Sequence, residues 1–203
     1  VSRGGHKLVG ALDSFSQIDV KGKTALDAGA STGGFTDVLL KRGVRKVVAV
    51  DVGYGQLAWE LQKDERVKIL DRVNVRNLTP AQVGEEIDLV VADLSFISLK
   101  LVLPALISVA KEEADFLIMV KPQFEVGKEQ LGAGGVVRDA HLRKEAVSQV
   151  ADAAFAQNLG CCGVVASSLP GPAGNVEYFL WLRKGAPALL EVDLDLAISK
   201  GPA

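Results

Sequence analysis

Hydrophobic residues along this chain follow two alternating patterns. Continuous apolar runs of about four to eight residues are separated by longer segments in which apolar residues recur every three or four positions. The first pattern is typical of strands covered on both faces, and the second of amphipathic helices. We therefore predict a doubly wound, Rossmann-like α/β fold with a mostly parallel sheet. The predicted strands span residues 24–28, 46–50, 67–70, 89–92 and 116–120.

The first predicted helix follows the chain start. Leu8, Leu12 and Phe15 share one helical face, which places Lys7 near the beginning of that helix. Further helices are expected at 35–42, where Gly43 ends the pattern, and at 56–62. Another is expected near 104–110, because Pro104 is tolerated at a helix start and not inside one.

The last part of the chain predicts a change of strand direction. A long helix over 139–157, with Asp139 as its N-cap, is followed by apolar runs at 164–167 and 176–182. Residues 170–174, which contain two prolines and two glycines, separate these runs and predict an antiparallel hairpin. Such a hairpin distinguishes the chain from an all-parallel dehydrogenase. Residues 125–138 form a long glycine-rich loop, either a functional lid or a disordered excursion.

Composition limits the classes of protein to consider. The 203 residues, 48% of them hydrophobic, suffice for one domain with one core. The net charge of -2 lacks the basic surplus of a dedicated RNA binder. Local basic groups are Arg3, His6 and Lys7, whereas we interpret the basic cluster within 41–46 as solvated charge at helix ends. The chain has no apolar run of about 18 residues and no signal-peptide pattern, so we expect a cytoplasmic protein.

The two cysteines do not indicate a metal site. Cys161 and Cys162 are adjacent in an apolar stretch, without the spacing of metal ligands. We expect both to be buried, reduced core residues, and we expect no metal.

A glycine-rich turn joins the first predicted strand to the next helix. It carries Asp27 and then Gly29, Ser31, Gly33, Gly34 and Phe35. Bare backbone at such a turn lets a ligand lie close to the chain, and Asp51, at the end of the next strand, is placed to accept hydrogen bonds from ribose hydroxyls. The turn departs from the G-x-G-x-x-G dinucleotide fingerprint, and Asp27 suits a ligand with an amino group better than a pyrophosphate. These features favour a nucleoside such as S-adenosylmethionine (SAM) over NAD. Asn74, after the third strand, either reaches the adenine edge or simply forms a turn.

Three polar residues follow the ends of predicted strands, where open α/β sheets place their chemistry. They are Asp51, Asp93 and Lys121. Lys121 is either a solvated strand end or a partly buried group held beside a carboxylate. Asp51 and Asp93 on neighbouring strands favour the second interpretation.

Several of these segments carry a family resemblance. Residues 2–8 (Ser-Arg-Gly-Gly-His-Lys-Leu), the turn at 27–35, Asp93, Lys-Pro-Gln-Phe-Glu at 121–125 and Gly-Gly-Val-Val-Arg-Asp at 134–139 resemble the TlyA (hemolysin A) family of ribosomal RNA cytidine-2′-O-methyltransferases, within the FtsJ-like group. The resemblance implies SAM as cofactor, S-adenosylhomocysteine as product, and ribosomal RNA in ribosomal subunits as partner. It also implies a Lys-Asp-Lys-Glu tetrad of Lys7, Asp93, Lys121 and Glu177, the last in the terminal hairpin strand. The implied cofactor residues are Asp27, Gly29, Ser31, Gly33, Gly34, Phe35, Asp51, Asn74 and Asp93.

The resemblance leaves some questions open. Members of the family carry an N-terminal RNA-binding domain, so we expect residues 1–203 to be the methyltransferase domain without it. Lys121 is either a base for the hydroxyl proton or a fixed electrostatic guide. The alternatives are a nicotinamide-dependent oxidoreductase, a membrane-active hemolysin-like protein and a SAM-binding module without catalysis. The sequence does not determine the oligomeric state.

Overall fold

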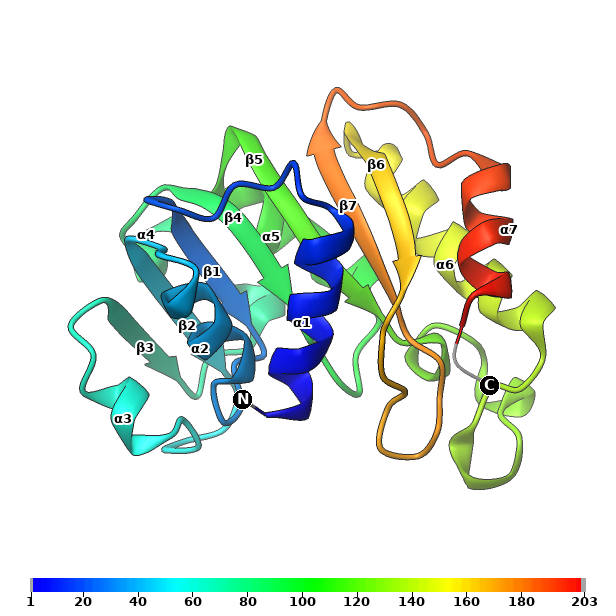
Figure 1. Cartoon of the computed structure of the whole chain (residues 1–203), viewed down its shortest axis with the longest axis horizontal. Coiled ribbons are helices and arrows are strands. Elements are labelled where there is room, and N and C mark those ends of the chain that lie inside the picture. The colour runs from blue at the N-terminus through cyan, green and yellow to red at the C-terminus, as the bar shows by residue number, and fades with distance from the viewer. Residues whose placement is uncertain (1, 202–203) are drawn as a thin grey trace.

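A seven-stranded sheet forms the centre of the computed structural model, which describes residues 2–201, with Lys128 by its backbone alone (Figure 1). The strand order is β3-β2-β1-β4-β5-β7-β6. Strands β1 to β5 are parallel, and β7 is antiparallel to both of its neighbours. This confirms the predicted Rossmann-like fold with a terminal antiparallel hairpin. The strands are β1 (Thr24–Ala28), β2 (Lys46–Asp51), β3 (Val67–Asp71), β4 (Ile87–Ala92), β5 (Ala110–Val120), β6 (Leu159–Ala166) and β7 (Tyr178–Lys184).

Helices cover both faces of the sheet. They are α1 (Arg3–Ser14), α2 (Gly34–Lys41), α3 (Trp59–Gln62), α4 (Pro80–Val83), α5 (Leu103–Val109), α6 (Ala140–Phe155) and α7 (Glu191–Ser199). Within β1, Ala25 packs into the core under α1 and α2, while Leu26 packs into the core that contains α5 and α6. Alternate residues of one strand thus enter opposite cores, which explains why the neighbouring residues Ala25 and Leu26 are both apolar.

Two predicted helix starts are confirmed by their caps. Ser2 accepts a hydrogen bond from the backbone N–H of Gly5 at 3.2 Å and begins α1, with Lys7 in its second turn. Asp139 accepts from the N–H of His141 at 2.8 Å and begins α6. Caps of this kind stabilise a helix by about 1 kcal/mol each.

The helix predicted over 56–62 is shorter than expected. The structure has only α3 there, because Gly55 has a left-handed φ of 63° and Ala58 is extended, with ψ of 140°. Strand β5 is longer than its apolar run, since its first residues include Lys111, Glu112 and Glu113. Hydrophobicity alone therefore finds the buried end of this strand and misses the exposed one.

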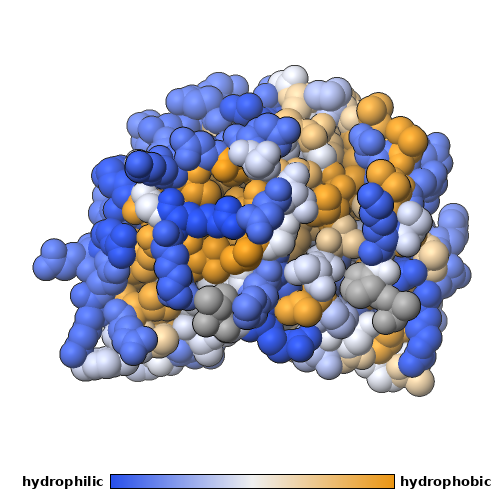
Figure 2. Space-filling model, viewed as in Figure 1, coloured by the Kyte–Doolittle hydropathy of each residue, from blue (hydrophilic) through white to orange (hydrophobic). Residues whose placement is uncertain are grey.

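The C-terminal helix α7 was not predicted. It packs against β6 and α6, and Lys144 of α6 forms ion pairs at 2.7 Å with both Glu191 and Asp195. On the face shown in Figure 2, hydrophobic side chains gather near the start of α7, where Leu190 and Val192 are exposed. Because apolar residues lie on more than one side of α7, its sequence lacks the periodicity that marks α1.

One prediction about the cysteines was wrong. Cys161 is buried, but Cys162 is exposed. Neighbouring residues of a strand face opposite sides of the sheet, and on the edge strand β6 the side that carries Cys162 is exposed. The basic cluster at 41–46 lies on the surface, as we interpreted it. Its members pair with surface acids, and Lys41 contacts Asp37 at 2.7 Å.

Candidate active site

A cleft of about 490 Å³ opens at the carboxyl ends of β1, β2 and β4. Its volume lies in the range of small-molecule sites. The predicted cofactor residues that line it are Gly29, Ser31, Asp51, Asn74 and Asp93. A smaller hollow of about 340 Å³ beside the start of α1 adds Gly34 and Phe35. The structure thus brings together residues that the sequence places on four different segments.

The glycine-rich turn requires its glycines for close packing. A Cβ at Gly29, which has φ of 87°, would lie 2.5 Å from the backbone oxygen of Asp93. Gly33, with φ of 93°, is the N-cap of α2, and a Cβ there would overlap Leu61. Ser31 also has positive φ, at 49°. Backbone, and not side chains, therefore forms this wall of the cleft.

Asp51 fixes the shape of that wall. One carboxylate oxygen accepts from the N–H of Ser31 at 2.8 Å, and the other accepts from the N–H of Gly53 at 2.7 Å. Each oxygen retains a second lone pair for a ligand hydroxyl. Asn74 also lines the cleft, while its side-chain oxygen accepts from the N–H of Arg76 at 3.0 Å. Asn74 therefore forms a turn and also lies where it can contact a ligand in the cleft.

Asp27 is a buried carboxylate beneath the turn. Its Oδ2 accepts from the Thr36 hydroxyl at 2.7 Å, and its Oδ1 has no hydrogen-bond partner within residues 2–201. Burial raises the pKa of Asp27 to about 7, against the Thr36 hydrogen bond, and the negative charges of Asp93 and Asp51 add to the rise. Three carboxylates therefore converge on one region of the structure.

This convergence favours a cationic ligand. The amino group of SAM would supply a donor to Asp27, and its sulfonium would offset the acidic charge. A pyrophosphate would instead be repelled by the same acids. The site fits SAM better than NAD. Phe35 contributes through its backbone, since its ring is buried against Phe179, 6.2 Å away between centroids.

Three of the predicted catalytic residues adjoin the ends of neighbouring strands beside this cleft, and the fourth, Lys7, lies on α1. Val120 of β5 pairs with Tyr178 of β7, so that Lys121 and Glu177 flank this pair at the same end of the sheet. Asp93 directly follows β4, the other neighbour of β5. Glu177 precedes β7, and its prediction as a strand residue was therefore wrong by one position.

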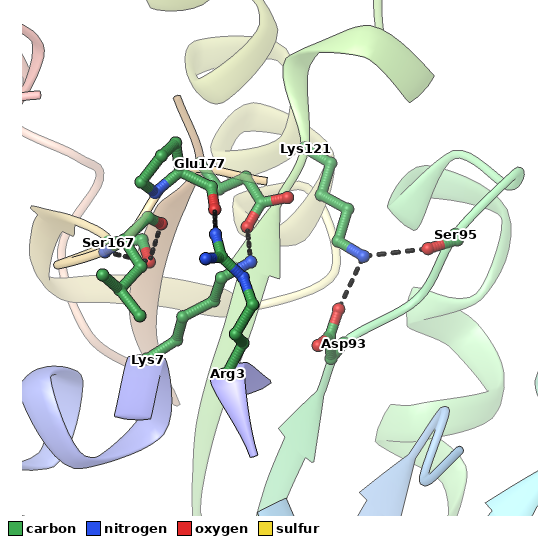
Figure 3. Close-up of polar contacts among 9 residues, drawn as sticks. Arg3, Lys7, Asp93, Ser95, Lys121, Ser167 and Glu177 are labelled. Carbon is green, nitrogen blue, oxygen red and sulfur yellow. Dashed lines mark hydrogen bonds and ion pairs between the residues drawn. The ribbon is translucent and has the colours of Figure 1, made fainter. Parts of the chain in front are cut away.

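The four side chains form two ion pairs (Figure 3). Lys121 Nζ lies 2.6 Å from Asp93 Oδ1 and donates to Ser95 Oγ at 2.9 Å. Lys7 Nζ, from α1, donates to Glu177 Oε2 at 2.5 Å, and both of these side chains are buried. Lys121 is therefore a held group beside a carboxylate and not a solvated strand end.

Two contacts near the ion pairs were not predicted from the sequence. Ser95 contacts Lys121, and Arg3 donates to the Pro170 oxygen at 2.9 Å, which ties α1 to the loop before Glu177 (Figure 3). Arg3 belongs to the motif at residues 2–8, whereas Ser95 follows Asp93 by two residues. Only the spatial contacts show that both residues lie beside the two ion pairs.

Fold and cleft together define a methyltransferase that uses SAM. The FtsJ-like methyltransferase family model matches residues 1–184. The chain is 59% identical over its whole length to the 16S/23S rRNA (cytidine-2′-O)-methyltransferase TlyA of Mycobacterium tuberculosis, of which it covers 77%. The chain belongs to the FtsJ-like methyltransferase family. The alternative of a nicotinamide-dependent oxidoreductase is thereby wrong.

Two further relatives carry the hemolysin name. The chain is 38% identical to Hemolysin A of Brachyspira hyodysenteriae, over 88% of the chain and 74% of that protein. The crystal structure of a candidate hemolysin from Lactococcus lactis matches with a TM-score of 0.93 and 38% identity, covering 98% of this chain and 97% of that one. Among residues 2–201, no helix combines the length and apolar character needed to cross a membrane.

Proposed function

We propose that this chain transfers the methyl group of SAM to the ribose 2′-hydroxyl of a cytidine in ribosomal RNA, acting on ribosomal subunits in the cytoplasm. The observation that carries the proposal is the position of the Lys121–Asp93 pair. It lies at the rim of a cleft whose acids suit SAM, because Asp93 belongs to both the pair and the cleft. The name of the Mycobacterium tuberculosis relative supports cytidine as the target nucleoside.

The cofactor is held mainly from the first three strands. Asp27 would accept from its amino group, and Asp51 would accept from its ribose hydroxyls. The backbone of the glycine-rich turn would hold its methionyl part, and Asn74 would contact the adenine edge. The turn residues concerned are Gly29, Ser31, Gly33, Gly34 and Phe35. Bound in this way, SAM supplies a methyl group on a positively charged sulfur.

The residues of the two ion pairs orient the acceptor. Lys121, held 2.6 Å from Asp93, would contact the 2′-hydroxyl and direct its oxygen at the methyl group. It would receive or steer the hydroxyl proton as the new C–O bond forms and S-adenosylhomocysteine leaves. Lys7 and Glu177 form the opposite side of the acceptor site. Orientation of two reactants supplies about 7 to 11 kcal/mol of a barrier, whereas acid–base catalysis supplies roughly 10² to 10⁴-fold in rate. Positioning by these side chains is therefore the larger contribution.

Methyl transfer from labelled SAM to isolated small and large ribosomal subunits tests this proposal. We expect label in ribosomal RNA, at a nucleotide that resists alkaline cleavage because its 2′-oxygen is methylated, and we expect that nucleotide to be cytidine. A Lys121→Ala variant is the negative control. Label on a base, or on another nucleoside, would overturn the proposed acceptor.

A further inference from the structure

Glu125 is not one of the four tetrad residues, but its carboxylate binds a neighbouring loop. It is partly buried, and burial raises its pKa. Its Oε2 accepts from the Ser98 hydroxyl at 2.6 Å, and its Oε1 accepts from the backbone N–H of Leu99 at 2.7 Å. Both carboxylate oxygens therefore act on a segment 26 or 27 residues earlier in the chain.

The segment that Glu125 holds carries a catalytic contact. Ser95 accepts from Lys121, and residues 94–97 form part of the SAM cleft. Phe96 has φ of 64°, a left-handed conformation that is costly for a bulky residue and persists only when surrounding contacts impose it. The segment thus needs external support to keep Ser95 in place.

A short turn after β5 supplies this support. Lys121 precedes the 3₁₀ turn Pro122–Phe124, and Glu125 follows it, its N–H donating to the Pro122 oxygen at 3.0 Å. The Phe124 ring lies against Phe96, with centroids 5.1 Å apart. One turn thereby contacts both ends of the 95–99 segment, at Ser95 through Lys121 and at Leu99 through Glu125.

We propose that Glu125 is a positioning residue for methyl transfer, which acts by fixing the 95–99 segment so that Ser95 holds Lys121. This inference rests on the proposed function for its catalytic effect. Removal of the Glu125 carboxylate frees the Ser98 and Leu99 donors, and Ser95 then moves away from Lys121. Glutamine preserves the clamp, because its amide oxygen accepts from Leu99 and its amide nitrogen donates to Ser98.

Hydrogen–deuterium exchange tests the clamp without any methyl transfer. In Glu125→Ala we expect faster exchange at the Leu99 amide and in the 94–99 segment, and in Glu125→Gln we expect protection close to that of the unmodified protein. Glu129→Ala, an exposed acid of the same loop, is the matched control and should leave this segment unchanged. Unchanged protection in Glu125→Ala would overturn the proposal, even if rRNA methylation were absent altogether.

A double-mutant cycle tests the catalytic consequence. Single-turnover methyl transfer should slow by at least about tenfold in Glu125→Ala, the scale of one lost hydrogen bond to a charged group, and should recover in Glu125→Gln. Because Glu125 acts through Ser95, its replacement should have little further effect in a Ser95→Ala background. Residues without contact usually give additive effects, so additive losses would overturn the coupling. Absence of label in the unmodified protein would contradict the proposed function, while the exchange result still decides the clamp.

Discussion

The Lys121 ammonium lies 2.6 Å from the Asp93 carboxylate, across the ends of two adjacent parallel strands. Lys121→Ala should therefore leave the affinity for S-adenosylhomocysteine nearly unchanged and reduce methyl transfer by about 10² or more, because it removes the contact that we propose Lys121 makes to the acceptor in the transition state. Lys121→Arg should not restore activity, since the guanidinium places its charge differently. Calorimetric titration and single-turnover rates measure the two effects.

Lys111, at the opposite end of the same strand, provides the control. It pairs with Asp88 at 2.8 Å, away from the cleft, and Lys111→Ala should retain both affinity and rate. A near-normal rate of methyl transfer by Lys121→Ala would refute the tetrad assignment. Asp93 would then be the candidate for the main catalytic group.

Asp27 should make cofactor affinity depend on pH. Burial raises its pKa to about 7, and the ionised carboxylate attracts the ligand ammonium much more strongly than the neutral acid does. With that pKa, the ionised fraction rises from about one tenth at pH 6 to about nine tenths at pH 8. The apparent Kd for S-adenosylhomocysteine should then fall by about tenfold over this interval. Titrations at several pH values, repeated on Asp27→Asn, measure it.

Asp27 should also make the stability of the ligand-free protein depend on pH. Because the folded-state pKa of Asp27 is raised, its contribution to stability is complete below about pH 4 and is lost as the pH rises to about 7. Asp27→Asn should remove this part of the pH dependence. A Kd that stays constant from pH 6 to 8 in the unmodified protein would place Asp27 outside the ligand contacts.

The parts of the fold found from sequence are those with a local cause. Continuous apolar runs identified five strands, and Asp139 identified the start of α6, because burial on both faces and capping leave direct marks on neighbouring residues. Helix α7 has neither a capping side chain nor a helical pattern of apolar residues. Cys162 was misassigned because its exposure depends on the position of β6 at the edge of the sheet, which neighbouring residues do not show.

The candidate site shows the same limit. Strand ends predicted the neighbourhood of Asp51, Asp93 and Lys121, since parallel strands end at one edge of a sheet. The sequence could not show that Lys7 pairs with Glu177, 170 residues away, while Lys121 pairs with Asp93. Partner choice depends on the packing of α1 against the sheet, which no local pattern encodes.

Asp51 should be essential for cofactor binding. Asp51→Ala removes the acceptor for the ligand ribose and also the two backbone contacts that shape the glycine-rich turn, so the affinity for S-adenosylhomocysteine should fall at least tenfold, or about 1.4 kcal/mol. Asp71, the paired residue at the end of β3, is a matched control that accepts from Gly55 at 2.9 Å. Asp71→Ala should bind normally. Equal affinity in a folded Asp51→Ala would exclude this residue from the site.

Gly171 should be needed to seat the Glu177 carboxylate. A Cβ at Gly171 would lie 2.6 Å from Glu177 Oε1, closer than real Cβ contacts allow. Glu177 is buried and paired with Lys7, so its side chain can move away from the added Cβ only by weakening that ion pair. In Gly171→Ala we therefore expect slower methyl transfer, by about tenfold or more, with unchanged cofactor affinity and a modest drop in the unfolding temperature. Pro172→Ala, at an exposed position of the same turn, should behave normally in all three measurements. If Gly171→Ala kept its full rate, the contact between this turn and Glu177 would have no part in aligning the acceptor.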